Sequence, residues 1–145
     1  AQEAIFPGQK FAKSFITLTS EQAREVERRS DANVRHKEVQ VWKVASGGYF
    51  IVDEVVGKHE FITYAVGLSP DGKVLGIEIL SYRETHGGQV REAAWRKHFA
   101  GKTLADPFKL DEDVPNISGA TLSCRNVLDG VKRLLVIHKL YLARG

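Results

Sequence analysis

The fold is decided by residues 39–82, which read VQVWKVASGGYFIVDEVVGKHEFITYAVGLSPDGKVLGIEILSY. Runs rich in Val, Ile, Tyr and Phe are typical of strands, and this stretch holds four of them: Val39–Val44, Tyr49–Val56, Phe61–Leu68 and Val74–Tyr82. Short segments containing Gly, Pro, Asp or Ser separate one run from the next. Because connections this short force neighbouring strands to run antiparallel, we expect a meander sheet of about four or more strands.

Upstream of the sheet, the sequence predicts an irregular arm and one short helix. The arm covers Ala1 to Lys13. Thr19 and Gln22 have the spacing of a capping box, so a helix is expected to start there and to end near residues 30–33. A chain of 145 residues fits one domain. We therefore expect a single domain over 1–145, with arm and helix in 1–37 and sheet and binding core in 38–145.

Two further helices are expected downstream of the sheet. The first runs from about Gln89 to Ala100, with Gly101 as its C-terminal stop. The second is long, from about Thr121 to Leu142, because apolar side chains recur there at three- and four-residue steps: Val127, Val131, Leu134, Leu135, His138 and Leu142. Two to three helices packed on an antiparallel meander make the class α+β.

Composition argues against several kinds of function. The net charge is +3 and the basic residues are scattered, so a nucleic-acid site is not expected. No apolar run approaches the roughly 20 residues of a membrane-spanning helix. The five histidines lack ligand spacing, so no metal site is expected, and the one cysteine, Cys124, cannot form an internal disulfide.

The start of the chain bears on its location. The sequence contains no Met and begins Ala1-Gln2-Glu3-Ala4. These residues are consistent with a terminus left by removal of a signal peptide, so a periplasmic or otherwise extracytoplasmic location is expected. The alternative is a trimmed piece of a longer protein.

The chemistry is concentrated in Asn116-Ile117-Ser118-Gly119-Ala120-Thr121-Leu122-Ser123, directly before the long helix. A helix N-terminus offers unpaired N–H groups and the positive end of the helix dipole, which suits a phosphate. Gly119 and Ala120 keep bulk away, while Ser118, Thr121 and Ser123 supply hydroxyls. On these grounds alone, a simple helix cap by one of the three hydroxyls remains the alternative.

The segment from Ser118 to Ser123 resembles the flavinylation motif of the FMN-binding domain family, which includes flavin subunits of the sodium-pumping quinone reductase and of the Rnf complex. The resemblance implies that FMN is joined through a phosphoester to the motif's threonine, which is Thr121 here. It also implies a magnesium-dependent FMN transferase that uses FAD as donor. Leu122, beside the acceptor, would lie against the flavin ring.

A second stretch, Tyr82-Arg83-Glu84-Thr85-His86-Gly87-Gly88, resembles a loop of the same family. Gly87 and Gly88 would let main chain approach the ring, and Thr85 would hydrogen-bond its pyrimidine side. Glu84 would orient the loop or bind the ribityl hydroxyls, and His86 would supply a proton during reduction. Tyr82 or Trp95 could stack on the ring, although Trp95 at helical spacing is more typical of a core residue.

Three features depart from the family pattern. The family often has an acidic residue six positions before the acceptor, where this chain has Pro115, with Asp113 two residues further away. Where the family's loop usually has a proline, this chain has His86. The flavin subunits of the membrane complexes also carry an N-terminal membrane helix, which this sequence lacks, and this favours a free shuttle.

The sequence therefore predicts an extracytoplasmic electron-transfer flavoprotein with covalent FMN on Thr121 and no catalytic residues of its own. Its expected partners are the transferase and redox proteins such as cytochromes, iron–sulfur proteins or membrane quinone-linked complexes. One alternative is an FMN-dependent reductase domain acting on a small molecule or quinone. The other is a non-redox binding or sensory module in which Thr121 only caps a helix.

Overall fold

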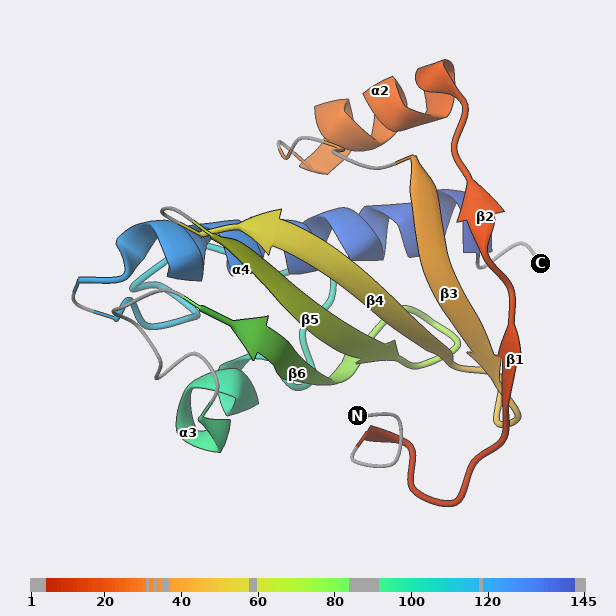
Figure 1. Cartoon of the computed structure of the whole chain (residues 1–145), viewed down its shortest axis with the longest axis horizontal. Coiled ribbons are helices and arrows are strands. Elements are labelled where there is room, and N and C mark those ends of the chain that lie inside the picture. The colour runs from red at the N-terminus through yellow and green to blue at the C-terminus, as the bar shows by residue number, and fades with distance from the viewer. Residues whose placement is uncertain are drawn as a thin grey trace.

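The computed structural model describes residues 5–30, 32, 34, 37–57, 60–83, 92–117 and 119–142. Its centre is an antiparallel meander (Figure 1) of four strands, β3 (Glu38–Val44), β4 (Tyr49–Val56), β5 (Phe61–Leu68) and β6 (Val74–Tyr82). The predicted meander is confirmed, and only the first strand differs, by one residue at its start. The class is α+β, as predicted.

Two short strands extend this sheet and correct the predicted irregular arm. β1 (Phe11–Lys13) and β2 (Ile16–Thr17) both pair antiparallel with β3, which makes a sheet of six strands. The prediction was wrong for residues 11–13. Strands of three and two residues are too short to show an alternating pattern, and the hydrogen bonds that hold them come from the distant edge of β3.

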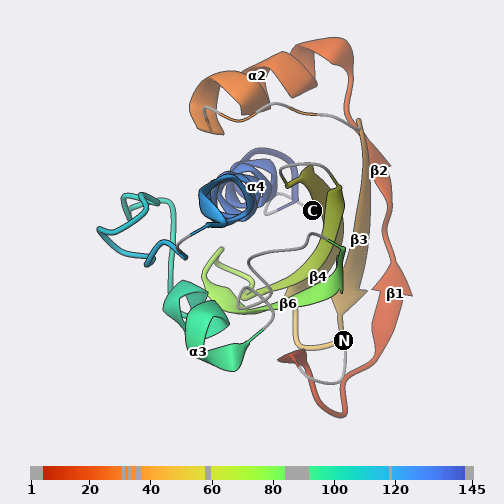
Figure 2. The same ribbon diagram turned by 60° about the vertical axis from the view of Figure 1, so that its left-hand side comes forward.

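The long helix α4 (Thr121–Ile137) lies along one face of the sheet (Figure 2) and continues as a π-helical segment, η3 (His138–Leu142). Every side chain of the predicted apolar stripe is buried. α2 (Ser20–Ser30) packs on α4 and begins with the predicted capping box. There the Thr19 N–H donates to Gln22 Oε1 at 2.8 Å, and the Gln22 N–H donates to Thr19 Oγ1 at 3.1 Å. Within the described part of the chain, no helix is both long and apolar enough to span a bilayer.

A buried polar cluster joins α4 to the sheet. The Tyr64 side chain, which is 0% exposed, donates its hydroxyl to Asp53 Oδ2 at 2.8 Å, and Arg133 of α4 forms an ion pair with the same carboxylate. Burial, followed by the Asp53 charge, raises the pKa of Tyr64 well above its ordinary value. Gly130 lies over this cluster, and a Cβ there would come within 2.3 Å of the Tyr64 hydroxyl oxygen. The close approach explains a glycine in the middle of a helix.

The N-terminal segment covers part of the other face of the sheet. Phe6 belongs there to a second apolar cluster with Phe50 and Ala65. A Cβ at Gly67 would lie 2.2 Å from Ile5 Cγ2, so the strand position without a side chain makes room for this segment.

The helix predicted from Gln89 to Ala100 is shorter in the described residues. α3 (Ala93–Arg96) is one turn, and η2 (Lys97–Phe99) continues it as a 3-10 turn; residues 89–91 lie outside the described part. The chain turns at Gly101, where φ is +85°, as predicted. Trp95 is 5% exposed and packs edge-to-face on Phe99 at 5.2 Å, so Trp95 is a core residue and not an open stacking surface.

Candidate functional site

The candidate site is the N-terminus of α4, which begins at Thr121. Gly119 has φ +82°, a left-handed conformation that favours glycine, and a Cβ there would meet no atom of the described residues within 4 Å. Ala120 is the N-cap residue, and its side chain cannot form a capping hydrogen bond to the first N–H groups of α4. Among the described residues, the first N–H groups of α4 are therefore not occupied by a capping side chain, and the space beside Gly119 is open.

Thr121 stands at the surface of this turn. Its side chain is exposed, and its Oγ1 accepts a hydrogen bond from Asn116 Nδ2 at 3.1 Å. Leu122 next to it is 46% exposed, which is unusual for a leucine at the first turn of a buried helix. A hydroxyl and an apolar side chain are thus presented together to solvent.

Asn116 is itself held by the loop before the motif. Its N–H donates to Asp111 Oδ1 at 3.1 Å, and the carbonyl of the preceding Pro115 accepts from Trp95 Nε1 at 2.8 Å. The Asn116 Oδ1 atom is buried and has no hydrogen-bond partner among the described residues. Asn116 was not predicted as a site residue. The only signal in the sequence was its place at the head of the 116–123 segment.

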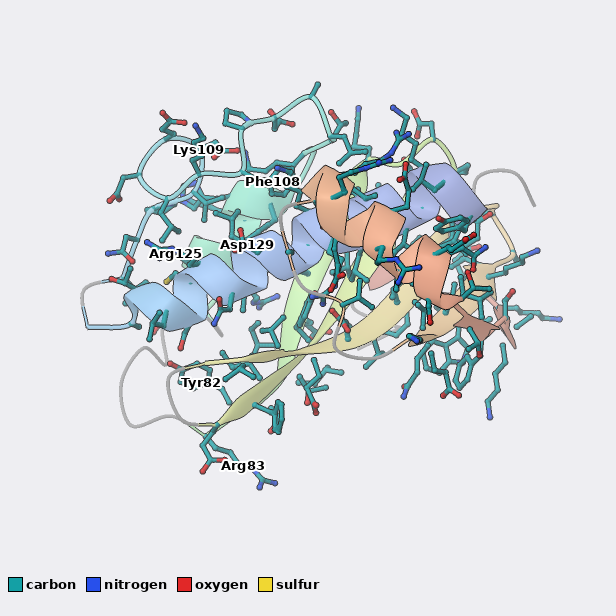
Figure 3. All side chains as sticks on the ribbon, turned by 90° about the horizontal axis from the view of Figure 1, so that it is seen from above. Tyr82, Arg83, Phe108, Lys109, Arg125 and Asp129 are labelled. Atoms are coloured by element: carbon teal, nitrogen blue, oxygen red, sulfur yellow. The ribbon has the colours of Figure 1, made fainter. Side chains whose placement is uncertain are left out.

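The other residues at the start of α4 face the core. Ser123 is buried, and its Oγ lies 3.4 Å from the Tyr82 hydroxyl, which donates to it. Cys124 is buried, and this burial raises the pKa of its thiol. Tyr82 is half-buried at the end of β6, so the structure brings the first residue of the second sequence stretch into contact with the start of α4. Figure 3 shows the exposed Arg83 beside it.

Asp113 organises the loop that leads into the site. Its carboxylate accepts N–H bonds from Phe108 at 3.1 Å and Lys109 at 2.8 Å, and it pairs with Lys102 at 3.0 Å. Burial tends to raise the pKa of Asp113, but the Lys109 N–H, the Lys102 ammonium and the Phe108 N–H together lower it. The Asp113 carboxylate is thus occupied by contacts within the loop and with Lys102, and these contacts do not include Thr121.

Several predicted site residues lie outside the described residues: Ser118, Glu84, Thr85, His86, Gly87 and Gly88. Their roles stay predictions. The described members of the predicted set are Gly119, Ala120, Thr121, Leu122 and Ser123, and the structure gathers all five at one helix end. Of the hydroxyls in this described set, only that of Thr121 is exposed, because that of Ser123 points inward to Tyr82.

This arrangement fits a phosphate that carries an aromatic group. The open N–H groups and the dipole at the start of α4 favour an anion, with a dipole contribution of about 0.3–1 kcal/mol at an exposed end. The exposed Leu122 offers an apolar contact for a flat ring. An electrostatic contribution of this size is too weak to retain a ligand alone. A covalent bond would keep the ligand attached without further binding free energy from the surface.

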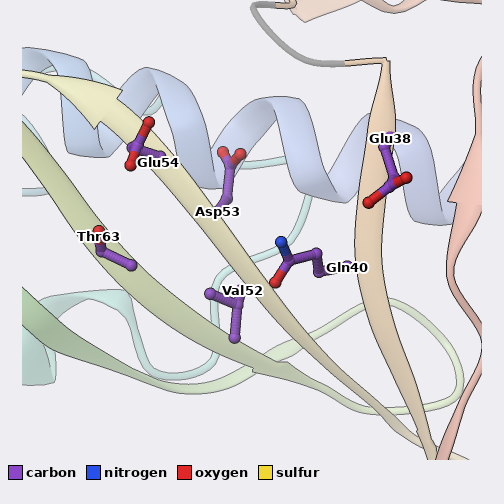
Figure 4. Close-up of a pocket in the computed structure, with 6 residues that line it drawn as sticks. All are labelled: Glu38, Gln40, Val52, Asp53, Glu54 and Thr63. Atoms are coloured by element: carbon purple, nitrogen blue, oxygen red, sulfur yellow. The ribbon is translucent and has the colours of Figure 1, made fainter.

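Three cavities lie elsewhere in the molecule. One, of about 290 Å³, opens where β3 and β4 diverge (Figure 4) and is lined by Glu38, Gln40, Val52, Asp53, Glu54 and Thr63. The other two, of about 310 and 350 Å³, adjoin the C-terminal half of α4 and share Leu104 and Lys139 in their lining. None of the three is lined by a described residue of the 116–123 segment.

Comparison with known proteins identifies the family. A sequence profile of the FMN-binding domain matches residues 57–136, more than half of the chain. The chain belongs to the FMN-binding domain family. The resemblance seen in the sequence is thereby confirmed, and the site described above falls within the matched part of this FMN-binding domain.

Two relatives illustrate the family. One of the subunits of the ion-translocating oxidoreductase complex of Stutzerimonas stutzeri is 32% identical over 85 residues, which cover 51% of this chain and 37% of that protein. The matched part is thus little more than a third of that relative's length. The crystal structure of Shewanella oneidensis NqrC superposes with a TM-score of 0.63 at 19% identity, covering 92% of this chain and 81% of that one. At this identity the likeness establishes the fold.

Proposed function

We propose that this FMN-binding domain is an electron-transfer module that carries one FMN bonded through a phosphoester to Thr121 and works outside the cytoplasm. The observation that carries the proposal is the exposed Thr121 hydroxyl at the uncapped N-terminus of α4, inside the segment that matches the FMN-binding domain. The name of the Stutzerimonas relative, a subunit of an oxidoreductase complex, supports a redox role.

In the proposed attachment reaction, an FMN transferase that requires magnesium transfers the FMN part of FAD to Thr121. The Thr121 oxygen forms a bond to the flavin-side phosphorus, and the phosphoanhydride bond of FAD breaks. AMP leaves with the bonding electrons, and the hydroxyl proton is released to solvent. The helix N–H groups would then neutralise part of the phosphate charge.

FMN supplies exchange of one or two electrons, whereas the chain binds, orients and presents the cofactor. An electron carrier fits the geometry better than a reductase with its own substrate. The Thr121 and Leu122 side chains are both exposed at the start of α4. A ring fixed at such a surface is accessible to partner proteins, for which we propose the components of a membrane redox complex or soluble cytochromes and iron–sulfur proteins. A covalent bond prevents loss of the cofactor by dilution outside the cell membrane.

Intact-mass spectrometry tests the proposal. We expect the domain coexpressed with an FMN transferase to gain the mass of one FMN less one water. Thr121→Ala should lose this gain completely, whereas Thr17→Ala, a change of an exposed threonine on β2, should retain it. Full labelling of Thr121→Ala would show that another residue is the acceptor. An unlabelled wild-type domain, in cells where a second flavinylation target is labelled, would refute the covalent link.

A further inference from the structure

The Asn116 side chain makes a contact that the stability of the unmodified protein does not explain. Its Nδ2 donates to Thr121 Oγ1 at 3.1 Å, while its Oδ1 is buried and finds no partner among the described residues. A buried acceptor without a partner lowers stability. An apolar side chain at 116 would avoid this loss, and the hydrogen bond that it would remove is an exposed one.

The position of Asn116 is fixed from the core. The Trp95 indole holds the carbonyl of Pro115, and Asp111 holds the N–H of Asn116. Val114, two residues earlier, is fully buried. Because these contacts anchor the main chain that leads into Asn116, the carboxamide reaches Thr121 from a fixed point, and so fixes the direction of a side chain that is otherwise exposed.

We propose that Asn116 is a positioning residue for the modification of Thr121, an inference that rests on the proposed function. In the unmodified domain, its N–H occupies one lone pair of Oγ1 and holds the hydroxyl in one rotamer, with the other lone pair directed outward for bonding to phosphorus. Once that bond has formed and the proton has left, the ester oxygen still accepts the same N–H. Asn116 thereby serves both the acceptor hydroxyl and the finished ester.

The test is steady-state kinetics of a purified FMN transferase, with FAD and magnesium, on the unmodified domain as substrate. Asn116→Leu should lower the kcat of modification about tenfold, since it removes a hydrogen bond that orients the nucleophile, and should leave KM for the domain nearly unchanged. The melting temperature of the unmodified variant should equal or exceed that of wild type. Gln40→Leu, at an exposed position on β3, is the matched control and should change neither quantity.

Asn116→Asp separates the two chemical roles that a side chain could have here. A carboxylate cannot donate to Oγ1, and its charge repels phosphate, so we expect modification slower than wild type. Faster modification would mean that position 116 acts by accepting the proton, and would overturn the assignment.

Three further outcomes would refute either the role of Asn116 or the proposed function. An unchanged rate in Asn116→Leu, with wild type modified at Thr121, would refute the role of Asn116 and leave the proposed function intact. A raised KM at constant kcat would show a contact with the transferase, which would also overturn it. A wild-type domain that is not modified at all would instead refute the proposed function.

Discussion

Replacing Gly130 by Ala tests the packing between α4 and the sheet. A Cβ at this position would lie 2.3 Å from the Tyr64 hydroxyl oxygen and 2.9 Å from Val55 Cγ1. Tyr64 is fully buried and is hydrogen-bonded to Asp53. The ring therefore cannot move outward without breaking that hydrogen bond and disturbing the pair between Asp53 and Arg133.

The expected loss of stability follows from three contributions. Alanine gains about 1 kcal/mol over glycine in a helix interior. Inserting a methyl group into a packed core costs roughly 1–3 kcal/mol, and displacing the Tyr64 hydroxyl from a charged acceptor costs about 1.5–3 kcal/mol. The free energy of unfolding should therefore fall by about 1.5–5 kcal/mol, which corresponds to a Tm lower by roughly 5–16 °C for a chain of this length.

Urea denaturation followed by circular dichroism measures this loss, and a double-mutant cycle assigns its cause. In a Tyr64→Phe background the 2.3 Å contact no longer exists, so Gly130→Ala should cost about 1–3 kcal/mol less than in wild type. Equal costs in both backgrounds would refute the role of the hydroxyl. A Gly130→Ala variant more stable than wild type would refute the packing argument altogether.

Two further predictions concern charge. Burial lowers the pKa of His138 below its ordinary 6.5, against the opposing effects of the Pro70 carbonyl and Asp71. The unfolded chain therefore binds more protons between the lowered pKa and pH 6.5, and stability should be full above pH 6.5 and fall as the pH drops through that window. Chemical denaturation at several pH values should show this slope in wild type and a flatter one in His138→Gln. The second prediction concerns Asp113. Asp113→Ala removes two N–H contacts and leaves the buried Lys102 without this carboxylate. The free energy of unfolding, measured in urea, should therefore fall by about 2–4 kcal/mol. A loss below about 1 kcal/mol would show that the loop is held by other contacts.

The sequence predicted the parts of the fold that are marked locally. β4, β5 and β6 have the predicted bounds because Gly and Pro residues separate dense β-branched runs. β1 and β2 could not be predicted, since their strand conformation depends on the edge of β3, far along the chain. Likewise, the buried trio of Tyr64, Asp53 and Arg133 joins residues from three elements, and no local pattern relates them.

The site was predictable to the same extent. The start of the long helix at Thr121 follows from apolar periodicity after Gly119. The family motif indicated the Thr121 hydroxyl as the attachment point, and this role stays a prediction. The contacts that hold Asn116 in place could not be predicted, because they come from Trp95 and Asp111 across a loop with irregular backbone. The flavin contacts expected from 84–88 fall outside the described residues and stay predictions.

The ion pair between Asp53 and Arg133 also allows α4 only one axial position. Sliding the helix by one turn would shift every residue along it by about 5.4 Å and would leave a buried guanidinium without its carboxylate. Apolar contacts alone would tolerate such a shift better, since valine and leucine recur along the helix. The height of Thr121 above the end of β6 is thus set by a charge twelve residues away in the sequence, on the same rigid helix.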